Sequence, residues 1–402
     1  MRVRHYFSRT ARSQDTSAIP SRLRMGTDSI GYNEQRNFAY FEGPEFIAAE
    51  VPDVFDVLRK VWHRLTGIGC SGLLHSFALP FNYSVAGFHY FNKILLRADP
   101  WVVTYETTLP RYPELPRPLL RFALSRLAAP NCRAILAISE CASQRFSKDL
   151  AENRAGLSHP CRDAIKSKLR TLHPPQRLLC TFEEKLLNWG FDGPLRLVLV
   201  GNDFYRKGGL ELLIAVEGLL RRGLQIELTI AGRMVAGDYA SRAGPEEAAK
   251  AGEIIRRHPG RIRAVGEVRN EQVVMLLKQA HVLCLPTWGD TYGYSVLEGQ
   301  AACCAAITTD VRALPEINNE QCGWVITVPK LSRGDAAIGT REERKAYHAL
   351  LVEGLLRTLS EAHDSRSMLQ AKAAQAVERI RRHHSPDEHR RALEEIYLAG
   401  FR

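Results

Sequence analysis

The chain has 402 residues, which is long enough for two domains that each bury a full core. Its composition, 45% hydrophobic and 25% charged, is that of an ordinary globular protein, and no apolar stretch approaches the roughly 20 residues of a membrane span. The net charge of +11 suits phosphorylated ligands, an anionic membrane or nucleic acid as partners. Because no nucleic-acid-binding motif is present, we expect no nucleic-acid partner.

The first 25 residues are unusually basic. Asp15 is their only acid, against six arginines: Arg2, Arg4, Arg9, Arg12, Arg22 and Arg24. This composition resembles a transit peptide. We favour two other interpretations, a basic arm or a fragment of a first βα unit.

Strands and helices alternate between residues 52 and 139. Short apolar runs predict strands over 72–77, 101–106 and 133–139. Helical apolar spacing predicts helices over 52–62, 84–97 and 116–128, and one more beginning at Glu140. This β–α–β order indicates a parallel sheet.

Three polar residues of this region, His75, Glu106 and Ser139, fall at the carboxyl ends of the predicted strands. Ligands of parallel sheets bind beyond these ends, so the three are candidates for contact with a substrate. Each also has an ordinary structural interpretation. His75 could be a satisfied histidine at the edge of the core, Glu106 could cap Thr107 or pair with Arg111, and Ser139 could be a helix N-cap.

A looser stretch over 151–192, containing Pro174-Pro175, indicates a connection between domains, after which the pattern begins afresh. The strands predicted in this second half are 195–201, 225–232, 262–266, 281–285, 307–310 and 323–326. The helices predicted there are 210–220 and 270–280, and residues 340–402 are expected to be helical throughout.

The loop between the strand over 195–201 and its helix carries Arg206-Lys207-Gly208-Gly209. Glycines and cations ahead of a helix suit anion binding. Arg206 can hold a phosphate group with two hydrogen bonds, whereas Lys207 offers a point charge. The spacing is not that of a P-loop, and a surface turn with two solvated cations is the alternative.

A second strand–loop–helix junction spans 284–301. Gly289 and Gly293 allow unusual backbone shapes, Ser295 is a good N-cap, and the helix that follows directs its free N–H groups at one point that suits a diphosphate. Asp290 and Glu298 bracket the loop. The alternative is that Ser295 and Glu298 form only a capping box, and that Asp290 is an ordinary turn residue.

The second half resembles the glycosyltransferase family 4 (group 1) proteins over about 195–330, and the first half does so more faintly over 72–145. The stretches that carry the resemblance are 200–209, 265–268 with 283–286, 290–301, and 307–323 with its Leu314-Pro315-Glu316. The resemblance implies an α/β protein of GT-B architecture, in which two Rossmann-like domains face each other across a cleft. We expect an amino-terminal domain over 1–190 and a donor-binding domain over 191–370, with carboxy-terminal helices over 371–402 that pack back toward the first domain.

The resemblance also implies an activity: a retaining glycosyltransferase that uses a nucleotide-diphosphate sugar, with no obligatory metal or cofactor. Arg206, Lys207 and Asp290 would be catalytic, and the acceptor would enter past His75, Glu106 and Ser139. The remaining donor-binding residues would be Gly201, Asn202, Gly208, Gly266, Gly293, Tyr294, Ser295 and Glu298. The acceptor would be a glycan or a lipid-linked molecule used in cell-surface polysaccharide or glycoconjugate synthesis.

The chain departs from the family pattern at four points. Asp290 replaces the first glutamate of the family's motif, Asn202 stands where arginine is usual, and Glu106 stands where a histidine is often found. The glycine-rich loop near the start of the first domain is missing. These differences bear on the identity of the sugar and on the geometry of the acceptor.

Two other functions fit the same fold. A non-catalytic module could bind a nucleotide sugar or a glycan without turning it over. A dinucleotide oxidoreductase ranks well below, because neither half shows G-x-G-x-x-G after a strand with an acid about 20 residues on.

The chain has nine cysteines and no C-x-x-C pair, which argues against a zinc site or a disulfide framework and for a reducing compartment. We therefore expect a cytoplasmic protein with no metal site. The basic charge adds the expectation of peripheral contact with the anionic inner face of a membrane.

Overall fold

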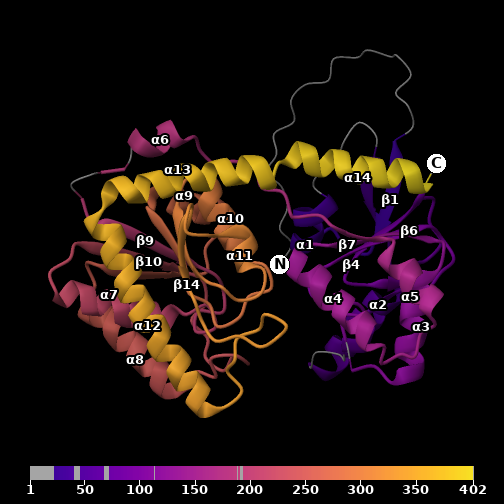
Figure 1. The fold of residues 1–402 in the computed structure, drawn as a ribbon, viewed down its shortest axis with the longest axis horizontal. Helices are drawn as coiled ribbons and strands as arrows, with labels where there is room; N and C mark the ends of the chain where they lie inside the picture. Colours follow the sequence, from indigo (N-terminus) through magenta and orange to yellow (C-terminus); the bar gives the residue numbers. More distant parts are fainter. Residues whose placement is uncertain are drawn as a thin grey trace.

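The computed structural model describes residues 22–39, 46–67, 72–112, 114–187, 189–190 and 193–401. Within these ranges the chain forms two α/β halves that lie side by side, the amino-terminal half on the right of Figure 1 and the carboxy-terminal half on the left. Each half is built on a six-stranded sheet whose strand pairs are all parallel. The predicted fold class, two Rossmann-like domains, is confirmed.

The sheet of the amino-terminal half has the strand order β2-β1-β4-β6-β7-β8. Its strands are β1 (Leu23–Thr27), β2 (Phe46–Glu50), β4 (Gly87–Phe91), β6 (Trp101–Tyr105), β7 (Cys132–Ala137) and β8 (Leu169–Thr171). Its helices include α2 (Val54–Thr66), α3 (Arg117–Ala128), α4 (Glu140–Glu152) and α5 (His159–Lys166). Every residue of β4 and β6 is buried, because helices or loops cover the sheet on both faces.

The first βα unit is present, although its sequence carries little periodicity. Strand β1 pairs with both β2 and β4 and lies second from the edge of the sheet. It is followed by two short helical turns, α1 (Tyr32–Glu34) and η1 (Gln35–Ala39). Residues 22–27 therefore belong to a first βα unit. Residues 1–21, which carry most of the basic segment, lie outside the described ranges.

Two predicted elements of this half are wrong. The helix expected over 84–97 is instead strand β4 followed by β5 (Ile94–Leu95). The strand expected over 72–77 is a 3₁₀ turn, η2 (Gly72–His75), and the two-residue strand β3 (Phe77–Ala78). The first of these errors has a physical cause. A strand buried on both faces reads as a continuous apolar run, which short-range periodicity cannot distinguish from a buried helix.

The sheet of the carboxy-terminal half has the order β11-β10-β9-β12-β13-β14. Its strands are β9 (Leu195–Val200), β10 (Ile226–Ala231), β11 (Ile262–Gly266), β12 (Val282–Leu285), β13 (Ala305–Thr309) and β14 (Gly323–Ile326). The helices between them are α7 (Gly209–Arg221), α8 (Pro245–Arg257), α9 (Asn270–Gln279), α10 (Tyr294–Ala301) and α11 (Leu314–Ile317). Each strand predicted in this half is present.

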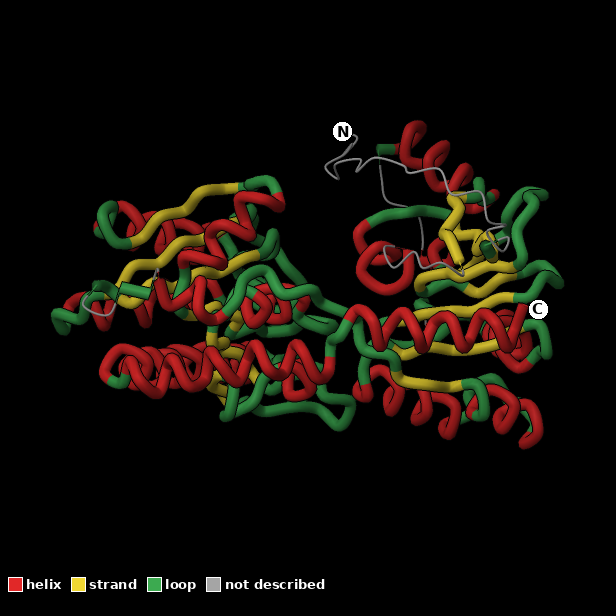
Figure 2. The backbone as a smooth tube through the Cα atoms, turned by 90° about the horizontal axis from the view of Figure 1, so that it is seen from above, coloured by secondary structure: helices red, strands yellow, loops and turns green. Residues whose placement is uncertain are grey.

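Three long helices end the chain and cross between the halves. Helices α12 (Arg341–Asp364) and α13 (Arg366–His383) pack on the carboxy-terminal half, against α7 and α10. Helix α14 (Pro386–Phe401) then continues onto the amino-terminal half, as Figures 1 and 2 show. There the hydroxyl of Tyr397 lies 2.5 Å from Nδ1 of His89 on β4.

The segment that joins the halves, 172–194, contains helix α6 (Phe182–Leu187). The eight cysteines that the structure describes are all unpaired thiols. Among the described residues, no helix combines the length and the apolar character that crossing a membrane would require.

Candidate functional site

The loop after β9 brings Lys207 back over the strand end. Gly201 has φ of 145°, and a Cβ atom at this position would lie 2.2 Å from Cε of Lys207. Gly208 has φ of 76°, and a Cβ there would lie 2.0 Å from the carbonyl oxygen of Pro286. Both positions need glycine, for space and for the left-handed backbone. The glycines therefore let the lysine side chain reach the loop that follows β12.

Lys207 and Asp290 form a buried ion pair. The lysine Nζ lies 2.9 Å from Oδ2 of Asp290, and both side chains are largely shielded from solvent. Burial alone would raise the pKa of Asp290, but the charges of Lys207 and Arg206 hold it below its usual value. Asp290 is therefore ionised at neutral pH and keeps the ammonium group at the carboxyl ends of β9 and β12.

Arg206 lies beside this pair. Its guanidinium donates to the carboxylate of Asp203 and to the carbonyl oxygen of Gly289, and its Cζ lies 6.0 Å from the centre of the Tyr239 ring. Arg206 is mostly buried, as Lys207 is. The alternative of a surface turn with two solvated cations therefore does not describe this loop.

Helix α10 points its amino terminus at the same cluster. Gly293, with φ of 91°, is its N-cap, so the helix begins two residues earlier than a Ser295 cap requires. Asp290 Oδ1 accepts from the backbone N–H of Gly293 at 3.1 Å and of Tyr292 at 3.4 Å. The prediction of Ser295 as N-cap is wrong; its buried hydroxyl has no protein partner among the described residues.

Glu298 does not close a capping box. Its carboxylate instead faces the first βα unit, where Oε1 accepts from the hydroxyl of Tyr32 at 3.4 Å and lies 3.5 Å from Nη1 of Arg36. Burial raises the pKa of Glu298 and Arg36 opposes this rise. A carboxylate of the carboxy-terminal half is thus paired with a cation of the amino-terminal half.

Three residues that sequence reasoning missed, Tyr32, Arg36 and Asn37, complete this side of the site. Asn37 Nδ2 donates to the hydroxyl of Tyr294 at 3.1 Å, and Arg36 Cζ lies 5.0 Å from the centre of the Tyr294 ring. The guanidinium of Arg36 also keeps two buried nitrogens, Nε and Nη2, without a protein partner in the described chain. In the sequence, these three residues are marked only by their position just after strand β1, which was itself not predicted.

The other donor-side candidates lie around the same loops. Gly266 ends β11, and its carbonyl accepts from the N–H of Gly232 at 2.8 Å. A Cβ on Gly232 would in turn lie 2.1 Å from the carbonyl oxygen of Gly201, so these three glycines are neighbours. Asn202 is exposed and accepts from the backbone N–H of Arg233 at 3.4 Å.

The acceptor-side candidates are distributed over the facing half. Glu106 lies 3.2 Å from Arg111 and accepts from Asn92, so the predicted pairing with Arg111 exists. Ser139 accepts from the N–H of Ala142 at 3.0 Å and is a helix N-cap, which was its alternative interpretation. His75 ends η2; burial and the charges of Arg59, Arg111 and Lys93 lower its pKa. The charge of Glu106 reaches across to Tyr294 of α10, where it adds to the rise in the pKa of that tyrosine.

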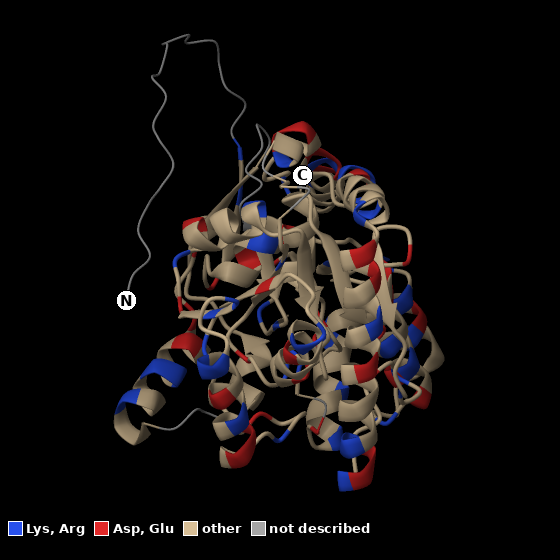
Figure 3. Cartoon of the chain, turned by 90° about the vertical axis from the view of Figure 1, so that its left-hand side faces the viewer, with Lys and Arg blue, Asp and Glu red and all other residues tan. Residues whose placement is uncertain are grey.

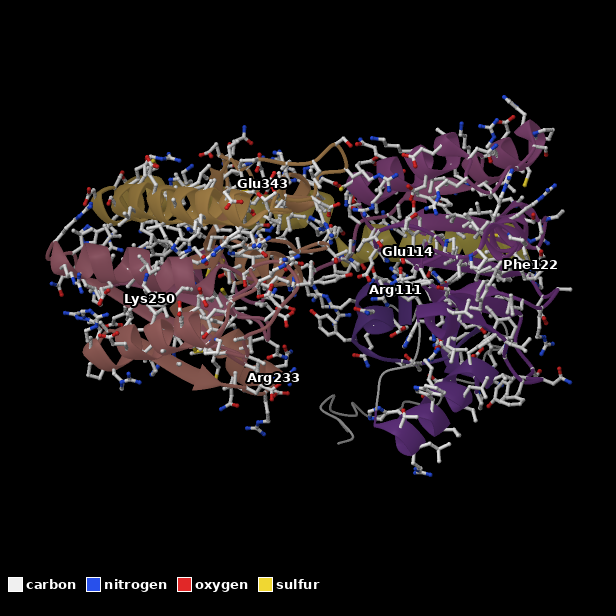
Figure 4. The ribbon with its side chains drawn as sticks, turned by 90° about the horizontal axis from the view of Figure 1, so that it is seen from below. Arg111, Glu114, Phe122, Arg233, Lys250 and Glu343 are labelled. Carbon is white, nitrogen blue, oxygen red and sulfur yellow. The ribbon has the colours of Figure 1, made fainter. Side chains whose placement is uncertain are left out.

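The halves are also joined directly. Glu316, from α11, accepts from the backbone N–H groups of Glu140 and Cys141 at 2.7 Å each, at the amino terminus of α4. Arg145 of α4 pairs with Asp335 at 2.9 Å. In Figure 4, Arg111 and Arg233 lie at the facing sides of the amino-terminal and carboxy-terminal halves. The candidate site therefore lies between two sheets whose strand ends face each other.

Two facing Rossmann-like halves are the architecture of the GT-B glycosyltransferases. Within the carboxy-terminal half, residues 194–337 match the family model described as "Glycosyl transferases group 1". The resemblance drawn from the sequence is thereby confirmed for this half. No curated protein matches the chain in sequence.

Solved glycosyltransferases share the fold of nearly the whole chain. A glycosyltransferase from Rickettsia africae is 13% identical with a TM-score of 0.57, the alignment covering 94% of this chain and 98% of that one. HepE from Anabaena, in complex with UDP, is 9% identical with a TM-score of 0.57 and coverages of 94% and 100%. Sucrose-phosphate synthase from Thermosynechococcus elongatus is 14% identical, with a TM-score of 0.54 and coverages of 94% and 88%. At these identities the similarity shows the fold.

Proposed function

We propose that this glycosyltransferase is a retaining enzyme that moves a sugar from a nucleotide-diphosphate sugar to a glycan or lipid-linked acceptor. The observation that carries the proposal is the buried Arg206–Lys207–Asp290 cluster at the amino terminus of α10. Two cations and the amino terminus of a helix lie together there, and this combination suits a diphosphate.

In this proposal the cluster stabilises the leaving group. The acceptor oxygen bonds to the anomeric carbon as the bond between that carbon and the diphosphate oxygen breaks. The diphosphate keeps the electron pair of the broken bond and takes up the proton that the acceptor hydroxyl loses. Arg206, Lys207 and the backbone N–H groups near Gly293 face the charge that develops, in a site shielded from water, where such interactions are strongest. The two side chains supply the positive charge that a metal ion provides in other transferases, so no metal is obligatory.

The carboxylates orient the donor. Asp290 is ionised and held by Lys207, and it would accept hydrogen bonds from hydroxyls of the sugar. Glu298 would accept from hydroxyls of the ribose and would then exchange its present contacts with Tyr32 and Arg36 for the ligand. Because HepE of Anabaena is solved with UDP and with UDP-glucose, uridine diphosphate sugars are the first donors to test.

The acceptor would approach from the amino-terminal half, past Glu106, Arg111 and His75. We propose a role in cell-surface polysaccharide or glycoconjugate synthesis, with the enzyme on the cytoplasmic side and in peripheral contact with an anionic membrane. The net charge of +11 supports this contact through attraction to anionic lipid.

The test compares Arg206→Ala and Lys207→Ala with Lys250→Ala, an exposed lysine of α8 that Figure 4 places away from the junction of the halves. The measurements are UDP-sugar hydrolysis, transfer to an acceptor panel, and UDP affinity by calorimetry. Each site variant should lose about 10²- to 10³-fold in rate, and Lys250→Ala should match the unchanged protein. Unchanged rates in both site variants would contradict the proposal.

The same measurements separate the enzyme from the non-catalytic alternative. A binding module would bind UDP with an affinity that Lys207→Ala reduces, yet would show no turnover of any donor with any acceptor. Loss of both binding and turnover in the site variants supports the transferase.

A further inference from the structure

Helix α2 turns its apolar side toward solvent. Residues at helical spacing form one stripe along it, and each of them is between 46% and 78% exposed: Val57, Leu58, Val61, Trp62 and Leu65. None of the residues of α2 is fully buried. A surface helix normally places such a stripe against the core, so the orientation of α2 is inverted.

The polar side of α2 fixes it to the protein. Arg59, which is largely buried, donates to the carbonyl oxygen of Leu74 at 2.7 Å and also pairs with Asp56 and Asp28. The N-cap Asp53 accepts from the backbone N–H groups of Phe55 and Asp56, and also from that of Leu79. These contacts hold the helix with its apolar stripe outward, and Figure 2 shows α2 projecting from the edge of the amino-terminal half.

Basic residues accompany the stripe. Lys60, His63 and Arg64 line a shallow surface depression together with Val57 and Val61, and Asp56 is the only acid within α2. Figure 3 shows the Lys and Arg of this projecting helix in blue at the lower left. Near the start of α2, two further aromatic residues, Phe81 and Tyr83, are about half exposed, and the N–H of Phe81 donates to the carbonyl of Pro52.

We propose that α2 docks on an anionic lipid bilayer, with its apolar stripe in the headgroup and acyl boundary and with Lys60 and Arg64 on lipid phosphates. This combination of leucine, tryptophan and flanking cations is characteristic of helices that lie in a membrane interface. A second copy of the chain fits less well, since two such helices packed face to face would bring Lys60, His63 and Arg64 of both copies together. The biological purpose of this docking rests on the proposed function, whereas the exposure and charge of α2 do not depend on it.

The docked helix would deliver a lipid-linked acceptor to the site. Arg59 of α2 contacts η2 through Leu74, the residue before His75. The charges near His75 include Arg59 and Arg111, and Arg111 pairs with Glu106. The membrane-facing helix thus contacts η2 next to the acceptor-side candidate His75.

The test is co-sedimentation of the full chain with two kinds of vesicle: phosphatidylcholine alone, and phosphatidylcholine with about 30% phosphatidylglycerol. Trp62→Ser with Leu65→Ser should reduce binding to anionic vesicles about 100-fold or more, because two large apolar side chains no longer leave water. Lys60→Gln with Arg64→Gln should reduce it roughly 25-fold and remove the preference for anionic lipid. Phe122→Ser, which changes an equally exposed apolar residue of α3 at the far end of this half in Figure 4, should bind as the unchanged protein does.

Each variant is also assayed for UDP-sugar hydrolysis without vesicles, and for its mass in solution. Normal hydrolysis with weakened vesicle binding supports the inference, whatever acceptor is eventually found. Equal vesicle binding by the unchanged protein and the Trp62→Ser, Leu65→Ser variant overturns it. So does a dimer that this variant converts into a monomer, because the stripe would then be an interface between copies. Loss of hydrolysis only in the Arg206 and Lys207 variants reports on the proposed function separately.

Discussion

Glu298 presents its carboxylate to the opposite half of the molecule, and this changes what the side chain can do. A buried carboxylate without a nearby cation takes up a proton more readily, because burial disfavours its charged form. Arg36 supplies that cation, and Tyr32 donates a hydrogen bond. Since only the ionised group accepts hydrogen bonds from two ribose hydroxyls, the amino-terminal half would control the nucleotide-binding role that we propose for Glu298.

The first prediction concerns the dependence of UDP affinity on pH. Burial already raises the pKa of Glu298, and Arg36 limits this rise. UDP affinity should therefore fall as the pH drops through this pKa, and in Arg36→Gln the fall should begin at a higher pH. Arg36→Lys should restore most of the original profile, because the charge is retained. Calorimetric titration from pH 8 to about pH 5 measures these profiles.

Glu298→Gln is the control for this prediction. It should weaken UDP binding at every pH and remove the acid limb of the profile. In Glu298→Gln, a further Arg36→Gln change should then have little effect, because the coupled partner is gone. Equal losses from Arg36→Gln in both backgrounds would mean that Arg36 acts on the nucleotide directly.

At the scale of elements, the second prediction tests the crossing of Lys207 over the end of β9. In Gly201→Ala the new Cβ would meet the lysine side chain at 2.2 Å, with backbone φ of 145°. The lysine must then leave Asp290 or the loop must shift, so UDP affinity should fall at least tenfold. The strained backbone should also lower the free energy of unfolding by about 1–3 kcal/mol. UDP calorimetry and urea unfolding measure the two effects.

Gly260→Ala is the matched control for Gly201→Ala. Gly260 lies in the loop before β11, has no left-handed backbone, and has nothing within 4 Å of an added Cβ. Its replacement should leave UDP affinity unchanged and stability within about 0.5 kcal/mol. If Gly201→Ala behaves like this control, the loop tolerates a Cβ and Lys207 does not depend on the glycine.

The elements that could be predicted are those whose pattern is local. Strands β9 to β14 are apolar runs bounded by turn residues, and each of them was predicted because a buried parallel strand has that signature. Strand β1, Leu-Arg-Met-Gly-Thr, has no such signature and is defined by its pairing with β2 and β4. For β4 the apolar run was visible, but its period suggested a helix.

The residues of the candidate site also divide into those that the local sequence could predict and those that it could not. Arg206, Lys207, Asp290 and Glu298 could be named because each lies in a glycine-marked loop or at a helix start in one half of the chain. The partners Tyr32 and Arg36 could not, since they meet Glu298 only when the two halves come together. The exposed stripe of α2 was also hidden, because apolar spacing predicts an amphipathic helix without saying which face is buried.

At the scale of the whole molecule, the segment that joins the halves is held by histidines from other elements. His281, at the start of β12, faces the carbonyl oxygen of Trp189 through Nε2 at 2.6 Å, while its Nδ1 accepts from the backbone N–H of Arg196. His384, after α13, faces the carbonyl of Pro174 through Nδ1 at 2.8 Å. The connecting segment is thus fixed at both ends by neutral imidazole rings.

The last prediction is that mild acid loosens this arrangement. Burial lowers the pKa of His281 and of His384 to about 3 each, against an unfolded value near 6.5. Below about pH 6.5 the unfolded chain binds protons that the folded chain refuses, so the free energy of unfolding should fall as the pH drops. Each histidine contributes up to about 1.4 kcal/mol per pH unit to this loss, until the folded pKa is reached.

Urea unfolding at pH 7.5, 6.5, 5.5 and about 4.5 measures this slope. His281→Asn and His384→Asn should each be less stable than the unchanged protein at pH 7.5, yet lose less stability on acidification. His63→Asn, which replaces an exposed histidine of α2, should keep the original slope. Parallel curves for all four proteins would show that other groups, such as the buried His389 or the carboxylates, determine the response to acid.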